Sequence, residues 1–204
     1  MTEPEVSLVA TPHGDARVHL LRPGGDAVGM MMLGHGAGGG VTAGDLRLAS
    51  EEALRVGLET ALVEQPYRVA GRKAPAPAAQ VDEAWRAVVE HVRRDGPLVV
   101  GGRSFGSRVA CRTSADVGAS GVLCLAFPLH PPGRPEKSRL PELTAVTVPT
   151  LVVQGERDAF GVPEPRTLPA THTLVVVDGD HSLKKDASAI RSAVGGWLAS
   201  VVSD

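Results

Sequence analysis

The stretch Gly101-Gly102-Arg103-Ser104-Phe105-Gly106-Ser107 lies between the apolar run 98–100 and a segment of helical periodicity that extends to residue 113. Its core is the pattern Gly102-x-Ser104-x-Gly106. At a sharp strand-to-helix turn of this kind the serine hydroxyl projects above the sheet, and the glycines let the two backbones come close. The pattern therefore predicts Ser104 as a nucleophile. Taken alone, it is also compatible with a glycine-rich turn that carries no chemistry.

Short apolar runs rich in valine and leucine recur on both sides of this junction. They are continuous rather than alternating, which is typical of parallel strands buried on both faces. The runs cover residues 28–33, 58–63, 98–100, 121–127, 150–153 and 173–177. Two alternating runs, 5–10 and 17–21, flank a turn signal at 12–15 and predict an opening antiparallel hairpin.

Helical periodicity fills the intervals between these runs, over residues 45–56, 79–92, 104–113 and 186–201. The proline-rich stretch 129–148 predicts a rim loop with one helical turn near Glu142. Strands that alternate with helices indicate an α/β protein with a doubly wound, mostly parallel sheet. At 204 residues we expect a single domain over 1–204, a three-layer sandwich without a cap domain.

A second glycine-rich loop, Gly34-His35-Gly36-Ala37-Gly38-Gly39-Gly40, follows the first strong strand. Acyl transfer needs two backbone N–H donors aimed at the oxyanion, one of them on the residue after the nucleophile. We expect these donors on Phe105 and Ala37. A phosphate-binding loop is the alternative, but the segment lacks the Lys-Ser/Thr of a P-loop and misses the GxGxxG frame.

An acidic residue and a histidine follow the last two strands. Asp158 is the preferred acid, with Glu156 in reserve, and His181 lies on a short glycine-containing loop. Either residue alone would be compatible with a solvated carboxylate or a structural histidine. Because all these loops follow different parallel strands, they should meet at one edge of the sheet. The order oxyanion loop, Ser, Asp, His then predicts a catalytic triad of Ser104, Asp158 and His181.

Four spans carry a resemblance to a known family: residues 34–39, 101–108, 127–133 and 154–158. They resemble the small α/β-hydrolases without a cap that are related to the testis-expressed hydrolase-like proteins, and more distantly the dienelactone hydrolases. This resemblance implies the α/β-hydrolase fold, no cofactor, and the same triad. Dienelactone hydrolases use a cysteine nucleophile where this chain has Ser104, so their activity is not implied.

The expected function is hydrolysis of an ester or related acyl substrate. Without a lid the site should be open, and we expect a rim that binds a small-molecule acyl substrate. Its predicted members are Tyr67, Arg68, Arg103, Phe105, Phe127, His130 and Phe160, and the expected substrate-binding residues among them are Tyr67, Arg103, Phe127, His130 and Phe160. Arg103 and His130 either favour an anionic acyl group or are ordinary rim residues. The alternatives for function are an acyltransferase or thioesterase, and a non-catalytic interaction module on the same fold.

Composition excludes several other classes. The net charge of −2 and the scattered Lys and Arg give no indication of a nucleic acid partner. We expect no membrane span, no secretory leader and a cytoplasmic location, with Cys111 and Cys124 as buried, reduced thiols. The histidines are scattered and no HExxH motif is present, so no metal site is predicted. The sequence does not indicate the oligomeric state.

Overall fold

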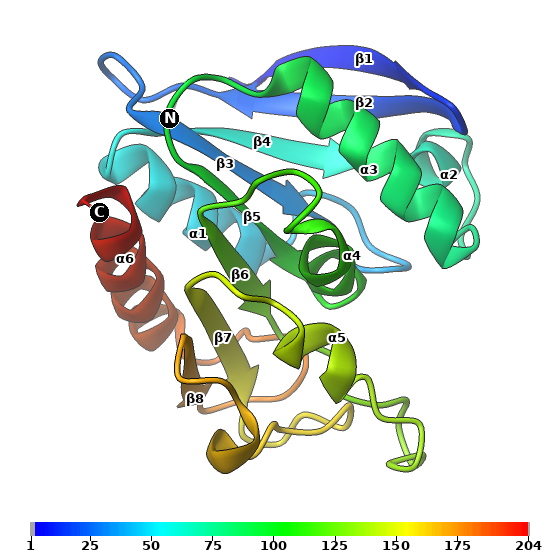
Figure 1. Cartoon of the computed structure of the whole chain (residues 1–204), viewed down its shortest axis with the longest axis vertical. Helices are drawn as coiled ribbons and strands as arrows, with labels where there is room; N and C mark the ends of the chain where they lie inside the picture. Colours follow the sequence, from blue (N-terminus) through cyan, green and yellow to red (C-terminus); the bar gives the residue numbers. More distant parts are fainter. Residues whose placement is uncertain (1–2, 204) are drawn as a thin grey trace.

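One sheet of eight strands, in the order β1-β2-β4-β3-β5-β6-β7-β8, runs through the molecule (Figure 1). The computed structural model describes residues 3–203. Strand β2 pairs antiparallel with both β1 and β4, and the other neighbours are parallel. The strands are β1 (Glu5–Thr11), β2 (Gly14–Leu21), β3 (Gly29–Gly34), β4 (Leu58–Glu64), β5 (Leu98–Arg103), β6 (Gly121–Leu125), β7 (Thr150–Gly155) and β8 (His172–Val177).

Helices cover both faces of this sheet. In Figure 1, α1 (Gly44–Arg55) and α6 (Ala187–Ser203) lie on one face, and α3 (Ala78–Val92) and α4 (Phe105–Thr113) lie on the other. The central strands supply both cores. In β3, for example, Met30 and Met32 pack in the core under α3 and α4, whereas Met31 and Leu33 pack in the core under α1 and α6. Burial on both faces explains why the apolar runs are continuous.

The predicted hairpin, the six other strands and the four long helices are confirmed. The helical turn near Glu142 is α5 (Leu140–Thr144). Two short elements were not predicted, α2 (Pro66–Val69) and the 3₁₀ helix η1 (Pro165–Thr167), because one turn of helix leaves no periodicity in the sequence. Cys111 and Cys124 are buried and not bridged. Within residues 3–203, no helix is long and apolar enough to cross a membrane.

One correction concerns the end of β6. The predicted strand 121–127 ends at Leu125, because Ala126 adopts a φ of 51° and redirects the chain. This change of direction buries Phe127 completely in the core. The expected rim position of Phe127 is therefore wrong, since its side chain has no surface to offer a substrate.

Three glycines bring β3, β5 and α4 into direct backbone contact. A Cβ added to Gly106 would lie 2.3 Å from the Gly34 carbonyl oxygen, and one added to Gly102 would lie 2.4 Å from the same atom. Real Cβ atoms do not approach an oxygen this closely, so any side chain at either position would force the three segments apart. The glycines on both sides of Ser104 are thus required by packing.

We predict that Gly106→Ala lowers the free energy of unfolding by at least about 2 kcal/mol, because the methyl group overlaps backbone atoms that cannot rotate away. Urea denaturation monitored by circular dichroism measures the change. Gly196→Ala is the matched control, since Gly196 is exposed on α6 with open space around its Cα. That variant should gain about 0.5–1 kcal/mol from helix propensity. Equal effects of the two variants would contradict the packing argument.

Candidate active site

Ser104 lies between β5 and α4 in a conformation that is rare for a residue with a side chain, with φ 53° and ψ −111°. Such backbone strain costs about 1–3 kcal/mol and persists only where the surroundings hold it. Here the Ser104 N–H donates to the Leu125 carbonyl at 2.8 Å. The Ser104 carbonyl accepts from the Ser107 hydroxyl at 2.6 Å and from the Ser107 N–H at 3.1 Å. These bonds hold the strained turn in place.

The structure brings the three predicted triad side chains together. The Ser104 hydroxyl lies 2.9 Å from His181 Nε2, and His181 Nδ1 lies 2.8 Å from Asp158 Oδ2. An ionised carboxylate only accepts hydrogen bonds, so the imidazole proton belongs on Nδ1 and Nε2 is free to accept from the hydroxyl. Three residues that are far apart in sequence therefore form one continuous hydrogen-bonded chain.

The Asp158 carboxylate is held by more than the histidine. Its side chain is fully buried and accepts from the Gln154 amide at 2.7 Å and from the Phe160 N–H at 2.8 Å. The reserve acid Glu156 is exposed and contacts Arg157 instead. Sequence reasoning missed Gln154. The available signal was a single polar residue at the end of the apolar run 150–153.

A ring contact and a hydrogen bond between two loops hold His181 in position. The Phe160 ring packs against it, with 4.2 Å between the ring centroids and 32° between the planes. The two loops that carry the acid and the histidine are also bonded to each other, since the Arg157 N–H donates to the Gly179 carbonyl at 2.9 Å. Phe160 thus contacts the imidazole of the candidate site directly and limits the rotation of the ring.

The glycine-rich loop after β3 lies beside Ser104. A Cβ added to Gly36 would be 3.8 Å from the Ser104 Cβ. Among the described residues, neither the Ala37 N–H nor the Phe105 N–H donates to a protein acceptor. The Tyr67 hydroxyl donates to the Ala37 carbonyl at 2.8 Å, and burial raises the pKa of Tyr67 to about 12, so the hydroxyl keeps its proton. Tyr67 is therefore a support of this loop, rather than the exposed rim residue that we expected.

His35 supports the same loop from within. Its Nδ1 lies 2.8 Å from the Gly36 carbonyl, and the Gln65 N–H donates to its Nε2 at 3.1 Å. These partners require a neutral ring with the proton on Nδ1. Burial lowers the pKa of His35 below its ordinary value, which keeps the ring neutral. No sequence pattern indicates this role beyond the position of His35 between two glycines.

Arg103 joins three parts of the candidate site. Its Nη2 donates to the His181 carbonyl at 3.0 Å, and its Nε pairs with Asp45 Oδ2 on α1 at 2.9 Å. A Cβ on Gly36 would lie 3.2 Å from its Nη1. The guanidinium is thus occupied by protein groups, and our expectation that Arg103 binds substrate is not supported. Burial raises the pKa of Asp45, although Arg103 opposes this effect.

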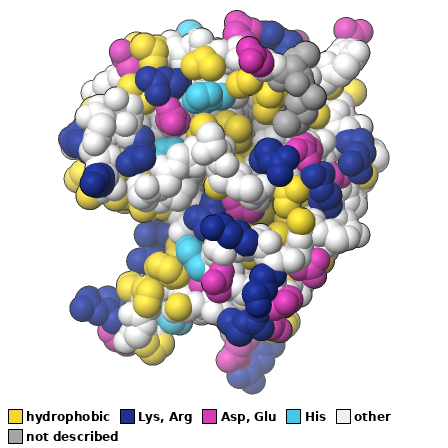
Figure 2. All heavy atoms as spheres, turned by 180° about the vertical axis from the view of Figure 1, so that it is seen from behind, with side chains coloured by type: hydrophobic (Ala, Val, Ile, Leu, Met, Phe, Trp, Pro, Cys, Tyr) yellow, Lys and Arg dark blue, Asp and Glu magenta, His cyan; other side chains and the backbone are white. Residues whose placement is uncertain are grey.

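The surface beside the site is hollowed. Figure 2 shows the hollow on one side of the molecule, between a larger and a smaller lobe, and Figure 1 places the chain between β6 and α5 on that side. Of the predicted rim residues, His130 and Phe160 are half-buried. The His130 N–H donates to the Phe160 carbonyl at 3.0 Å, which keeps both residues on the same wall.

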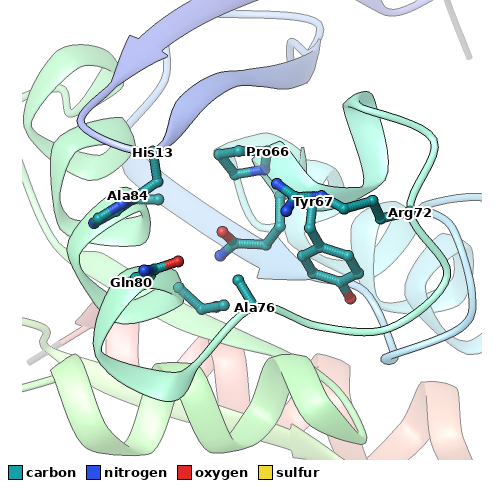
Figure 3. A pocket seen from close by; sticks show the side chains of 9 residues that line it. His13, Pro66, Tyr67, Arg72, Ala76, Gln80 and Ala84 are labelled. Carbon is teal, nitrogen blue, oxygen red and sulfur yellow. The ribbon is translucent and has the colours of Figure 1, made fainter.

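A separate small pocket lies behind the glycine-rich loop. Figure 3 shows His13 and Gln80 on one side of it, and Tyr67 and Arg72 on the other. Its volume is about 10 Å³, which is room for about one water molecule. None of Ser104, Asp158 and His181 lines it. This pocket is distinct from the candidate active site.

Within residues 3–203, no three His, Cys, Asp or Glu side chains lie close enough together to hold a metal ion.

Comparison with protein families gives one match. The model of the alpha/beta hydrolase domain family matches residues 27–197, which is most of the chain.

Solved structures of similar shape include serine hydrolases and esterases. One is a serine hydrolase without a lid from Xanthomonas campestris, with 21% identity, a TM-score of 0.77, and coverage of 100% of this chain and 97% of that chain. Est1E from Butyrivibrio proteoclasticus has 14% identity, a TM-score of 0.77, and coverage of 98% and 99%. A dienelactone hydrolase from Anabaena variabilis has 17% identity, a TM-score of 0.71, and coverage of 97% and 98%. These likenesses confirm the predicted fold without a cap. The narrower resemblance to testis-expressed proteins stays a prediction.

The buried His35 generates a prediction about pH. Its pKa is lowered in the folded state, so between that value and about 6.5 the unfolded chain binds a proton that the folded chain does not. The contribution of His35 to stability should therefore be complete above pH 6.5 and decrease as the pH falls below it. Denaturation of the native chain and of His35→Asn between pH 5 and 8 measures this. The variant should lose less stability on acidification, by up to about 1.4 kcal/mol per pH unit, and parallel curves would contradict the assignment.

The buried ion pair generates a second prediction. Arg103→Met leaves the Asp45 carboxylate buried without its partner, so the free energy of unfolding should fall by about 3 kcal/mol. Adding Asp45→Asn to the same chain removes the orphaned charge and should recover at least half of that loss. Urea denaturation of the two single variants and the double variant forms the required cycle. If the two losses simply add, Arg103 and Asp45 are not coupled.

Proposed function

The chain belongs to the alpha/beta hydrolase domain family, and from this premise we propose that it is a serine hydrolase that cleaves an ester or a related acyl substrate. One observation carries the proposal: the hydrogen-bonded chain from the Ser104 hydroxyl through His181 to the buried Asp158 carboxylate. Its geometry has the distances that nucleophilic catalysis requires.

In the proposed mechanism, Ser104 Oγ attacks the acyl carbonyl carbon and its proton passes to His181 Nε2. The carbonyl oxygen becomes negatively charged and accepts from the N–H groups of Phe105 and Ala37. The Asp158 carboxylate stabilises the imidazolium through the Nδ1 proton. When the bond to the leaving group breaks, His181 Nε2 gives its proton to the leaving oxygen. An acyl-Ser104 ester remains.

Water completes the cycle at the same groups. His181 Nε2 takes a proton from the water molecule, whose oxygen attacks the acyl-Ser104 carbonyl. Collapse of the second tetrahedral intermediate breaks the bond to Ser104 Oγ, and the proton on His181 returns to that oxygen. The partial exposure of Ser104 and His181 supports hydrolysis, because solvent water has access to both side chains.

The strain at Ser104 argues for catalysis rather than for a non-catalytic interaction module. A scaffold gains nothing from a serine held at φ 53°, since a glycine there would remove the strain. The surrounding bonds instead maintain the one conformation in which the hydroxyl meets His181.

We predict that a fluorophosphonate probe labels the native chain and does not label Ser104→Ala, because the probe reacts with an activated serine hydroxyl. Hydrolysis of 4-nitrophenyl butyrate should fall at least about 10³-fold in the same variant. Ser182→Ala is the matched control, since Ser182 is adjacent to His181 and its N–H and hydroxyl donate to the Asp180 carboxylate. The control should retain labelling. Equal labelling of all three chains, or of none, would overturn the proposal.

A substrate panel separates hydrolysis from the other acyl-transfer reactions. With purified chain, 4-nitrophenyl esters and acyl thioesters of matched acyl length are compared in water and with added alcohols or amines. Release of free acid from the esters supports an esterase. Preference for thioesters, or transfer of the acyl group to the added nucleophile, would assign the same Ser104 chemistry to a thioesterase or an acyltransferase.

A further inference from the structure

Two surface segments beside the hollow are rich in basic residues and nearly free of acidic ones. Segment 65–81 follows β4 and carries three basic residues and no Asp or Glu, and segment 126–141 follows β6 and carries three basic residues and one Glu. The basic residues are Arg68, Arg72, Lys73, Arg134, Lys137 and Arg139. Figure 2 shows Lys and Arg side chains on both sides of the hollow. In a chain of net charge −2 this is a local concentration of positive charge.

These six cations also differ from the other arginines in their partners. Twelve arginines elsewhere in residues 3–203 form ion pairs with carboxylates. None of the six does so within the described part of the chain. Outside the two segments, the Lys and Arg that form no ion pair with another residue of 3–203 are Arg93, Lys184 and Lys185. Lys184 and Lys185 follow the His181 loop, at the sheet edge where the candidate site lies. Arg93, which precedes β5, is the one of these three residues that lies at the opposite edge.

Arg68 and Arg139 are the half-buried members of the set. Arg68 Nη1 donates to the Arg72 carbonyl at 3.3 Å, and Arg139 Nη1 donates to the Pro128 carbonyl at 3.0 Å. Each guanidinium has five N–H donors, so most of them remain free. Burial, together with the charge of Arg108, lowers the pKa of Arg139. Glu142 opposes this shift, but its carboxylate is paired with Arg108 and Arg112, so an additional anion at Arg139 would be favourable.

Each of these arginines lies on a segment that follows a strand ending at the candidate site, Arg68 after β4 and Arg139 after β6. Arg68 follows Tyr67, whose hydroxyl holds the Ala37 loop. On the other segment, the Arg139 N–H donates to the Leu129 carbonyl at 2.7 Å, and the adjacent His130 is bonded to Phe160. Phe160 in turn packs against His181. The segment that carries Arg68 is therefore bonded to the oxyanion loop, and the segment that carries Arg139 is linked through backbone bonds to the residue that packs against the imidazole.

We propose that the site takes esters that also carry an acidic group, a carboxylate or a phosphate, and that Arg68 and Arg139 bind that group. The inference rests on the serine hydrolase function proposed above. A guanidinium matches the paired oxygens of either anion and binds them through two parallel N–H donors. The surrounding lysines and arginines raise the local concentration of an anionic substrate, an effect that salt screens.

The test compares two esters that differ only in charge, 4-nitrophenyl hydrogen adipate and its methyl ester, after subtraction of the rate with Ser104→Ala. We expect kcat/KM to be about tenfold higher for the anionic ester at low ionic strength, and the ratio to fall at 0.5 M salt by a few-fold or more. Inhibition of the neutral ester's hydrolysis by free adipate and by inorganic phosphate then distinguishes a carboxylate from a phosphate as the preferred group.

Variants assign the effect to the two arginines. Arg68→Gln and Arg139→Gln should each lower the ratio of the two kcat/KM values by about three- to tenfold. Arg139→Lys keeps the positive charge and should therefore retain most of the preference for the anionic ester. Arg93→Gln, at the opposite edge of the sheet, should leave the ratio unchanged. A ratio near one in the native chain, or a ratio that the Gln variants do not change, would overturn the inference. If neither ester is hydrolysed and the fluorophosphonate probe does not label Ser104, the proposed function itself fails.

Discussion

The close contact of three backbones at Gly34, Gly102 and Gly106 determines the geometry on which the rest of the site depends. Because the Gly34 carbonyl lies where side chains at positions 102 and 106 would be, α4 can begin directly against β3. The chain must then turn within Ser104, which takes up a positive φ. The strain is thus a consequence of packing, and packing also places the serine hydroxyl above the sheet edge.

The other groups of the site reach Ser104 because loops from separate strands are tied to one another. Asp158 is held by Gln154 at the end of β7, and the acid loop is bonded to the histidine loop. Arg103 connects the histidine loop to α1 through Asp45, while His35 and Tyr67 hold the glycine-rich loop. The groups of the candidate site are therefore held in place by rigid elements, an arrangement that the proposed catalysis would require.

Much of the fold and the three central residues could be predicted from the sequence, since each predicted residue follows a strand whose apolar run is visible. The supporting residues could not. The apolar run 121–127 predicts a strand that ends at Phe127, but the turn at Ala126 that buries this ring depends on the distant Val153 carbonyl, which accepts the Ala126 N–H at 2.8 Å. The position of Arg103 beside Ser104 likewise predicts a substrate contact, because its partner Asp45 lies on a distant helix.

The sequence by itself determined the strand and helix pattern, the glycine positions, and Ser104 and His181 as candidates with Asp158 or Glu156 as the acid, because periodicity and turn requirements act over a few residues. Only the tertiary structure decided which carboxylate meets the imidazole, which arginines are paired and which are free, and which aromatic rings are buried. These properties depend on residues brought together across the sheet, and the energies of ion pairs and hydrogen bonds depend on distances and burial that no local pattern contains.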